Sequence, residues 1–244
     1  MNKANAVGVI LTIDVGGSHV KVMTNKTRIK REFTSGPKLG ASAMVAQVKE
    51  LTGDWSYDRV TVGYPGPVMR NRPAAEPHNL GKGWQGFDFT RAFGRPAKVV
   101  NDALMQALGD YKGGKMLFLG LGTGLGSAMI VDGALVPMEL AHLPYLKDKT
   151  FEEFVGAAAL KRHGKKKWQG YVNDVVNRLV AALEPDYVVI GGGNADKLRK
   201  LPRKSRLGKN SNAFLGGFRL WEDVEPRNSR LANRQTKPRR KSSR

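Results

Sequence analysis

Polar side chains that could do chemistry follow apolar strands in this sequence. In "KVVNDALMQALGD" (98–110), Asn101 and Asp102 stand between a short apolar run and an amphipathic helical pattern. Asp102 could cap this helix, because Asp is favoured at that position, or it could act as a catalytic carboxylate at the mouth of a site. The two roles can coexist, so the segment alone leaves both open.

Three glycine clusters also follow apolar runs, and they are Gly16-Gly17, Gly122-Thr123-Gly124 and Gly191-Gly192-Gly193. Glycine allows backbone N–H groups to approach an anion such as a phosphate closely. Tight hairpins need glycine as well, so a single cluster is weak evidence. Three clusters in one chain favour phosphate binding. None matches the P-loop pattern, and a hairpin follows "GLGTGLG" where a dinucleotide-binding fold needs a helix.

Further charged residues lie beside these clusters. Asp14 ends the first apolar run, where it could hold Mg²⁺ beside phosphates or accept hydrogen bonds from turn amides. Glu139 and His142 are three residues apart, a spacing that places them on one face of a helix or turn. A zinc site there would need two more ligands, and the chain has no cysteine.

The elements that must position these residues alternate between strands and helices. Strands are expected at 7–14, 19–23, 97–102, 115–136 (three strands) and 186–191, and residues 59–68 are expected to be a strand that runs into a Pro/Gly loop. Helices are expected at about 41–51, 103–110, 151–162 and 168–184, with a further helix start after Gly193. The similarity of "LTIDVGGSHVKVM" to "LFLGLGTGLGSAMIV" indicates two copies of one module, each opening with a glycine-rich β-hairpin. This pattern predicts an α/β fold with an N-terminal lobe (1–105), a C-terminal lobe (106–224) and an interlobe cleft.

Charge dominates the composition of this 244-residue chain, whose formal net charge is +20. The segment from Arg227 to Arg244 carries eight Lys/Arg and no acid, which leaves about +12 on residues 1–226. Basic clusters at 161–168 and 197–209 could hold a polyanion such as nucleic acid, anionic lipid or polyphosphate, or could be solvated surface. The tail (225–244) is expected to be disordered and to bind polyanions nonspecifically.

No apolar run approaches the roughly 20 residues of a membrane span, and the first residues read as a strand instead of a signal peptide. A cytoplasmic protein without a membrane partner is therefore expected.

Seven motifs follow one another along the chain: "DVGGSHVK" (14–21), "GYPGPV" (63–68), "HNLGKGWQGF" (78–87), "VVND" (99–102), "LGTGLGSAMIVDG" (121–133), "ELAH" (139–142) and "VVIGGGN" (188–194). Together they resemble the ROK family of sugar kinases, and within it the polyphosphate/ATP glucokinases. The resemblance covers roughly residues 7–221 and excludes the basic tail.

This resemblance implies an actin-like (ribonuclease H-like) two-lobed fold, and it implies roles for individual residues. Asp102 would be the general base that takes the proton from the 6-hydroxyl of glucose or a related hexose. The residues implied to bind the sugar are Asn79, Asn101, Asp102, Glu139, His142 and Glu152 (in preference to Glu153), with Pro65 and Gly66 beside them. Those implied to hold the donor phosphates are Asp14, Gly16, Gly17, Ser18, Gly122, Thr123 and Gly124, with Gly191, Gly192 and Gly193 facing the adenosine or a longer phosphate chain.

The family also implies Mg²⁺ at Asp14, ATP or inorganic polyphosphate as donor, and a homodimer. Ser18 replaces the usual threonine and keeps its hydroxyl, whereas Ala141 replaces a glycine of the usual "ExGH" motif. The cysteine motif that binds zinc in many members is missing, so no zinc is expected.

The alternative is a non-catalytic or regulatory sugar-binding protein that associates with nucleic acid or another polyanion through its basic surface and tail. Loss of Asp14 or Asp102 would favour that alternative, but both residues are present.

Overall fold

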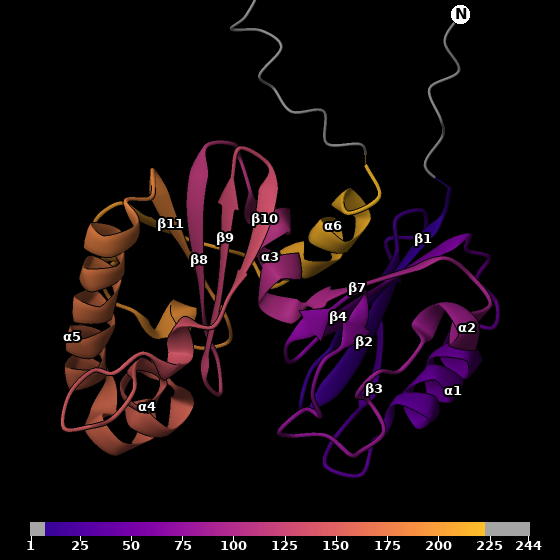
Figure 1. Ribbon diagram of the computed structural model, residues 1–244, viewed down its shortest axis with the longest axis horizontal. Coiled ribbons are helices and arrows are strands. Elements are labelled where there is room, and N and C mark those ends of the chain that lie inside the picture. Colours follow the sequence, from indigo (N-terminus) through magenta and orange to yellow (C-terminus); the bar gives the residue numbers. More distant parts are fainter. Residues whose placement is uncertain (1–7, 223–244) are drawn as a thin grey trace, which may run out of the picture.

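Two five-stranded sheets form the frame of the computed structural model, which describes residues 8–222 (Figure 1). The first sheet has the order β3-β2-β1-β4-β7. Its strands are β1 (Ile10–Val15), β2 (His19–Thr24), β3 (Arg31–Thr34), β4 (Arg59–Tyr64) and β7 (Ala97–Asn101). β1, β2 and β3 form an antiparallel meander, and β4 and β7 run parallel to β1. A small hairpin of β5 (Val68–Met69) and β6 (Arg72–Pro73) follows β4.

The second sheet repeats this plan in the order β10-β9-β8-β11-β12. Its strands are β8 (Lys115–Leu121), β9 (Leu125–Val131), β10 (Ala134–Met138), β11 (Tyr187–Gly191) and β12 (Ser205–Leu207). The meander β8-β9-β10 is again antiparallel, and the two later strands are parallel to β8. The expectation of two modules, each opening with a glycine-rich hairpin, is therefore confirmed.

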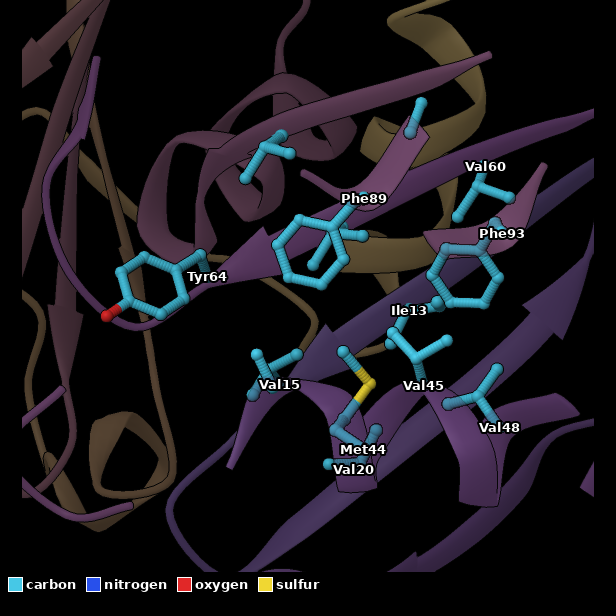
Figure 2. Close-up of a cluster of buried hydrophobic side chains, with 14 of the residues drawn as sticks. Ile13, Val15, Val20, Met44, Val45, Val48, Val60, Tyr64, Phe89 and Phe93 are labelled. Carbon is cyan, nitrogen blue, oxygen red and sulfur yellow. The ribbon is translucent and has the colours of Figure 1, made fainter. Parts of the chain in front are cut away.

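Helices α1 (Ala41–Leu51) and α2 (Phe89–Phe93) pack against the first sheet (Figure 2). Met44, Val45 and Val48 place the apolar stripe of α1 against strand residues such as Ile13 and Val60. This spacing is the helical periodicity seen in the sequence. The apolar burial on the sheet, worth ~2 kcal/mol per large side chain, holds the strand whose end carries Asp14.

Helices α4 (Phe151–Val155) and α5 (Ala157–Leu183) cover the second sheet. Trp168 anchors α5, since its ring is fully buried and its Nε1–H donates to the carbonyl of Val155 at 2.8 Å. Gly164, with φ of 73°, interrupts the helical backbone of α5. The sequence predicts a break between two helices at 163–167, and the break at Gly164 lies in that interval. The structure has a second break, at Gly156, which separates α4 from α5.

Two crossing helices lie between the sheets, namely α3 (Asp102–Asp110) and α6 (Asn212–Arg219) (Figure 1). They meet backbone to backbone, because a Cβ built on Gly216 would overlap the carbonyl oxygen of Met105. Helix α6 also reaches the first sheet, where Thr61 Oγ1 donates to the carbonyl of Gly217 at 2.8 Å. Helix α6, at the end of the described chain, thus packs on the N-terminal sheet. A boundary between two lobes near residue 105 remains a proposal.

Six short elements were not expected from the sequence: β3, β5, β6, α2, β12 and α6. The helix start expected after Gly193 is only a 3₁₀ turn, η2 (Ala195–Lys197), and a second such turn is η1 (Leu140–His142). Within residues 8–222, every helix is too short or too polar to cross a bilayer. The basic tail (225–244) lies outside the described residues.

Candidate active site

Asp102 is the first residue of α3, and Asn101 is the residue that caps this helix. The Asn101 side-chain oxygen accepts the N–H groups of Ala103 at 3.0 Å and Leu104 at 3.2 Å. The interpretation of Asp102 as the cap is therefore wrong, because the chain leaves the extended conformation of β7 one residue earlier. Asp102 Oδ1 accepts the N–H of Ala103 at 2.8 Å, which orients the carboxylate at the helix start.

Asn101 also ties the helix to the loop after β4. Its Nδ2 donates to the carbonyl of Gly66 at 3.2 Å. A side chain at Gly66 would approach the ring of Tyr64 to 2.9 Å, so the loop that holds Pro65 and Gly66 turns tightly over that ring. The structure thus joins two of the motifs that the sequence placed at the sugar.

Replacing Asn101 separates capping from any direct role toward a ligand. Asn101→Ala should cost ~1 kcal/mol of stability, seen as a melting temperature lower by about 2–4 °C. Asn101→Ser keeps a capping oxygen but loses the donor to Gly66, so its melting temperature should return towards wild type while any defect in sugar affinity persists. Equal melting temperatures for all three proteins would show that the cap contributes nothing.

The charges of two other carboxylates raise the pKa of Asp102. Burial, then the negative charge of Asp14 and, more weakly, that of Glu139 raise the pKa of Asp102 to about 7, against the opposing effect of its hydrogen bonds to backbone N–H groups. Burial also raises the pKa of Asp14, although Lys21 opposes this shift. Three acids from β1, α3 and the segment after β10 therefore converge between the sheets.

The first glycine hairpin is fixed from one side and open on the other. Ser35 holds it, because its Oγ donates to the carbonyl of Gly16 at 2.6 Å and its N–H donates to that of Ser18 at 2.9 Å. Gly17 and Ser18 remain exposed at the tip. Asn79 lies beside them, since a Cβ on Gly17 would be 3.2 Å from the Cβ of Asn79. This arrangement suits an anion at the tip of the hairpin with Asn79 next to it.

The second glycine hairpin is braced by Glu152. The Glu152 carboxylate occupies the space that a Cβ of Gly124 would need and accepts the N–H of Leu125 at 3.1 Å. The N–H of Ala157 donates to the carbonyls of Gly122 and Thr123, both at 3.1 Å. These contacts explain why glycine stands at 124, and they place Glu152 on the second glycine hairpin. Its predicted contact with sugar stays a prediction.

Glu153 has a different task from its neighbour. It forms a capping box with Thr150 at the start of α4, and it pairs with Lys149 at 3.2 Å. The carboxylate is exposed and already engaged. The choice of Glu152 over Glu153 as a sugar-binding residue stays a prediction.

The third glycine cluster is connected to the second by Asn194. The Asn194 Nδ2 donates to the carbonyl of Gly122 at 2.9 Å, and its backbone N–H donates to Leu121 O at 2.9 Å. Gly192 has φ of 85° and sits against the backbone of Leu121. Sequence reasoning gave Asn194 no role, although it directly follows the glycine run. The side chain is buried, so its function is to hold the two turns together.

Glu139 and His142 follow β10 on a segment pinned by Ser127. The Ser127 hydroxyl donates to Met138 O and accepts the N–H of Leu140, both at 3.0 Å. Glu139 and His142 are exposed. The charge of Glu139 contributes to the raised pKa of Asp102. Among the described residues, no hydrogen bond or ion pair joins the His142 side chain to another predicted site residue.

Metal ligation in this region would depend on very few side chains. In residues 8–222 no cluster of three or more His, Asp or Glu side chains is arranged to hold a metal ion. Asp14 with its raised pKa is a carboxylate that an added cation would stabilise, and Mg²⁺ accepts one or two carboxylates together with phosphate oxygens and water. The donor set therefore fits Mg²⁺ only when a phosphate donor shares it.

Known proteins give the same resemblance as the motifs. The chain is 29% identical over 215 residues to a polyphosphate glucokinase of Mycobacterium tuberculosis (strain CDC 1551 / Oshkosh), an alignment that covers 77% of this chain and 78% of that protein. No protein-family model matches the chain.

Solved structures show the fold. The inorganic polyphosphate/ATP-glucomannokinase of Arthrobacter sp. strain KM matches with a TM-score of 0.72 and 23% identity, covering 87% of this chain and 98% of the other. A ROK family glucokinase of Streptomyces griseus, solved in complex with glucose and AMPPNP, matches with a TM-score of 0.72 and 16% identity over 87% and 99% of the two chains. The expected actin-like two-lobed fold is confirmed.

Proposed function

We propose that this chain, which has the fold of the ROK sugar kinases and resembles polyphosphate glucokinases in sequence, is a hexose kinase. The reaction is transfer of a phosphoryl group from polyphosphate or ATP to the 6-hydroxyl of glucose. The observation that carries the proposal is the place of Asp102, whose carboxylate starts α3 between two glycine hairpins and near Asp14 and Glu139.

Asp102 would act as the general base. A carboxylate can accept the proton of a sugar hydroxyl as the bond to phosphorus forms, and a base with a pKa near the working pH does so efficiently. The fixed hydrogen bond from the N–H of Ala103 at 2.8 Å restricts the direction in which the carboxylate points. Phosphoryl transfer depends mostly on such positioning and on charge neutralisation.

The sugar would lie between the loop after β4 and the segment after β10. Asn79, Glu139 and His142 present exposed polar groups, and Asn101 fixes the loop of Pro65 and Gly66 beside Asp102. Neutral amides and carboxylates hydrogen-bond sugar hydroxyls well, because each hydroxyl both donates and accepts. These contacts, together with one from Glu152, are the proposed sugar site.

The donor phosphates would lie along the two hairpins. The backbone of Gly16–Ser18 and Gly122–Gly124 offers N–H groups without side-chain obstruction, and the Gly191–Gly193 turn lies next to the second hairpin through Asn194. Mg²⁺ bound by Asp14 together with donor oxygens would supply charge neutralisation of the transferred group.

A basic surface next to the second hairpin supports a long polyanionic donor. Gln169 of α5 joins the two basic clusters, since its Nε2 donates to Lys200 O at 2.6 Å and its Oε1 accepts the N–H of Arg199 at 2.9 Å. Lys197 reaches Asn194 Oδ1 at 2.6 Å, so the surface continues to the hairpin. Polyphosphate would be attracted along it, an effect that salt weakens. We also propose that the basic tail binds polyanions nonspecifically and that the protein is a homodimer.

A coupled assay for glucose 6-phosphate, with ATP and long-chain polyphosphate offered separately, tests the function. Formation of glucose 6-phosphate is expected with at least one donor, and added salt should raise KM for polyphosphate more than KM for ATP. Removal of residues 224–244 should leave the rate of glucose phosphorylation unchanged and should weaken only the binding of the protein to a polyanion. If no hexose is phosphorylated with either donor, the enzyme proposal fails and the regulatory alternative is favoured.

A further inference from the structure

The segment between β12 and α6 joins the third glycine turn to the helix that carries Asp102. Gly208 N–H donates to Ile190 O at 2.9 Å, so the segment starts along the end of β11. Two residues later, Asn210 Oδ1 accepts both the N–H of Gly192 at 3.2 Å and the Nε2–H of Gln106 at 3.0 Å. One side-chain oxygen therefore connects the turn of the second sheet to α3.

Gln106 lies on the same side of α3 as Asp102. The two residues are four positions apart, which places them one above the other on a helix. The Gln106 amide is also close to the turn itself, because a Cβ built on Gly191 would lie 2.7 Å from Nε2. Gln106 and Asn210 thus form a hydrogen-bonded link between α3 and the turn.

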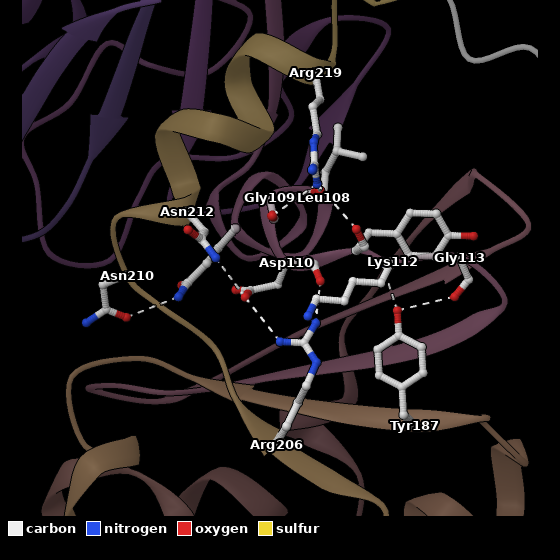
Figure 3. Close-up of polar contacts among 12 residues, drawn as sticks. Leu108, Gly109, Asp110, Lys112, Gly113, Tyr187, Arg206, Asn210, Asn212 and Arg219 are labelled. Carbon is white, nitrogen blue, oxygen red and sulfur yellow. Dashed lines mark hydrogen bonds and ion pairs between the residues drawn. The ribbon is translucent and has the colours of Figure 1, made fainter. Parts of the chain in front are cut away.

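The opposite end of α3 is anchored by a separate group of polar contacts (Figure 3). Asp110 is buried, its Oδ1 accepts from Asn212 Nδ2 at 2.8 Å, and its backbone carbonyl accepts from the Arg206 guanidinium. Arg219 donates to Leu108 O at 2.8 Å. These contacts hold the C-terminal end of α3, and Gln106 is the residue in the middle of the helix that is linked to the glycine turn through Asn210.

We propose that Gln106 and Asn210 are positioning residues that couple contact of the donor with the Gly191–Gly193 turn to the placement of Asp102. This inference rests on the proposed kinase function and deepens it. A phosphoryl donor bound at the turn restricts the backbone at Gly192, whose N–H donates to Asn210. Because Asn210 also accepts from Gln106, this restriction extends to α3 and orients the Asp102 carboxylate for catalysis. The pair touches neither the sugar nor the reacting atoms.

Single and double alanine variants test the coupling. Asn210→Ala and Gln106→Ala should each lower kcat about 10-fold, and the double variant should be no worse than either one, because both remove the same link. Glucose affinity measured by calorimetry should stay within about 2-fold. Asn210→Asp keeps the accepting oxygen and should keep kcat, although its charge raises KM for an anionic donor. Gln47→Ala, at an exposed glutamine of α1, is the matched control and should be silent.

Two results would overturn the coupling. One is a double variant whose loss equals the product of the single losses, and the other is a parallel loss of glucose affinity. If the wild-type protein phosphorylates no sugar, the proposed function fails, and amide hydrogen exchange decides the coupling by itself. Polyphosphate or ATP should then slow exchange in residues 102–108 of the wild type and leave Asn210→Ala unchanged. The same response in both proteins, or none in the wild type, contradicts the link.

Discussion

Asp102→Asn is expected to make the protein more stable at pH 8 and almost inactive. In the folded protein the pKa of Asp102 is raised from its ordinary value of 3.8 to about 7, chiefly by burial and by the charge of Asp14. A carboxyl with a raised pKa binds its proton more tightly in the folded than in the unfolded chain. Its ionisation therefore costs stability progressively as the pH rises from about 4 to about 7.

Asparagine removes that cost without changing the shape of the side chain. Its oxygen can still accept the N–H of Ala103, which now bonds Asp102 Oδ1 at 2.8 Å. Between pH 5 and pH 8 the stability advantage of Asp102→Asn should grow by roughly 2–3 kcal/mol, or about 5–10 °C in melting temperature. Thermal unfolding of both proteins at the two pH values measures it.

Asp110→Asn is a contrasting control on the same helix. Asp110 is buried and paired with Arg206 and Asn212, so its replacement should lower stability. A constant difference between Asp102→Asn and wild type across the pH range would show that Asp102 is not held at a raised pKa.

Although Asp102→Asn should stabilise the protein, it should greatly reduce catalysis. Loss of a general base typically lowers turnover ~10²–10⁴-fold. Glucose affinity should stay within a few-fold, because the amide still hydrogen-bonds a hydroxyl. Turnover close to that of the wild type would remove Asp102 from the role of base.

Gly216→Ala is expected to be strongly destabilising. A Cβ at this position would overlap the carbonyl of Met105 and approach the backbone N of Gly109 to 2.9 Å, so α3 and α6 must separate to admit it. Helix propensity favours alanine by ~1 kcal/mol, but overpacking against backbone costs ~3 kcal/mol or more. A net loss of about 2–4 kcal/mol is expected, measured by denaturant unfolding.

Gly170→Ala supplies the matched control. Gly170 lies in α5 and faces open space, with no atom within 4 Å of a Cβ built on it. The same substitution should there raise stability by ~0.5–1 kcal/mol. A similar gain in Gly216→Ala would show that the two central helices are not packed at backbone distance. A loss of activity in Gly216→Ala is also expected, because the displaced helix begins with Asp102.

Local patterns in the sequence were sufficient to predict the glycine hairpin that opens each sheet, but not the edge strands β3 and β12. Apolar strands on either side of a glycine turn announce a hairpin, and both hairpins lie where the motifs placed them. Helix α6 could not be found in this way, because its sequence "NAFLGGFR" has two central glycines that oppose a helix. Those glycines make sense only once α3 lies against them, which is a tertiary contact without a local signal.

The site residues chosen from the motifs stay a prediction, whereas the local contacts of several of them could not be read from the sequence. Asn101 and Asp102 are adjacent and both suit a cap, and only the backbone shows that the helix begins after Asn101. Glu152 was expected beside the sugar, whereas its visible contact is the hairpin at Gly124. The hydrogen bond between Gln106 and Asn210 joins residues 104 positions apart. Periodicity and motif spacing describe local structure only, so they could not predict this pair.

The pH dependence of kcat/KM for glucose, measured from pH 5 to 9 with a saturating donor, tests the proposed role of Asp102 most directly. With the donor saturating, this parameter reports the ionisation of the donor-bound enzyme before it binds glucose. It should rise with pH and level off above an inflection near the pKa of about 7 to which burial and Asp14 bring Asp102. A profile that is flat from pH 5 to 9, or one that Asp102→Asn retains at comparable rate, would contradict general-base catalysis by Asp102.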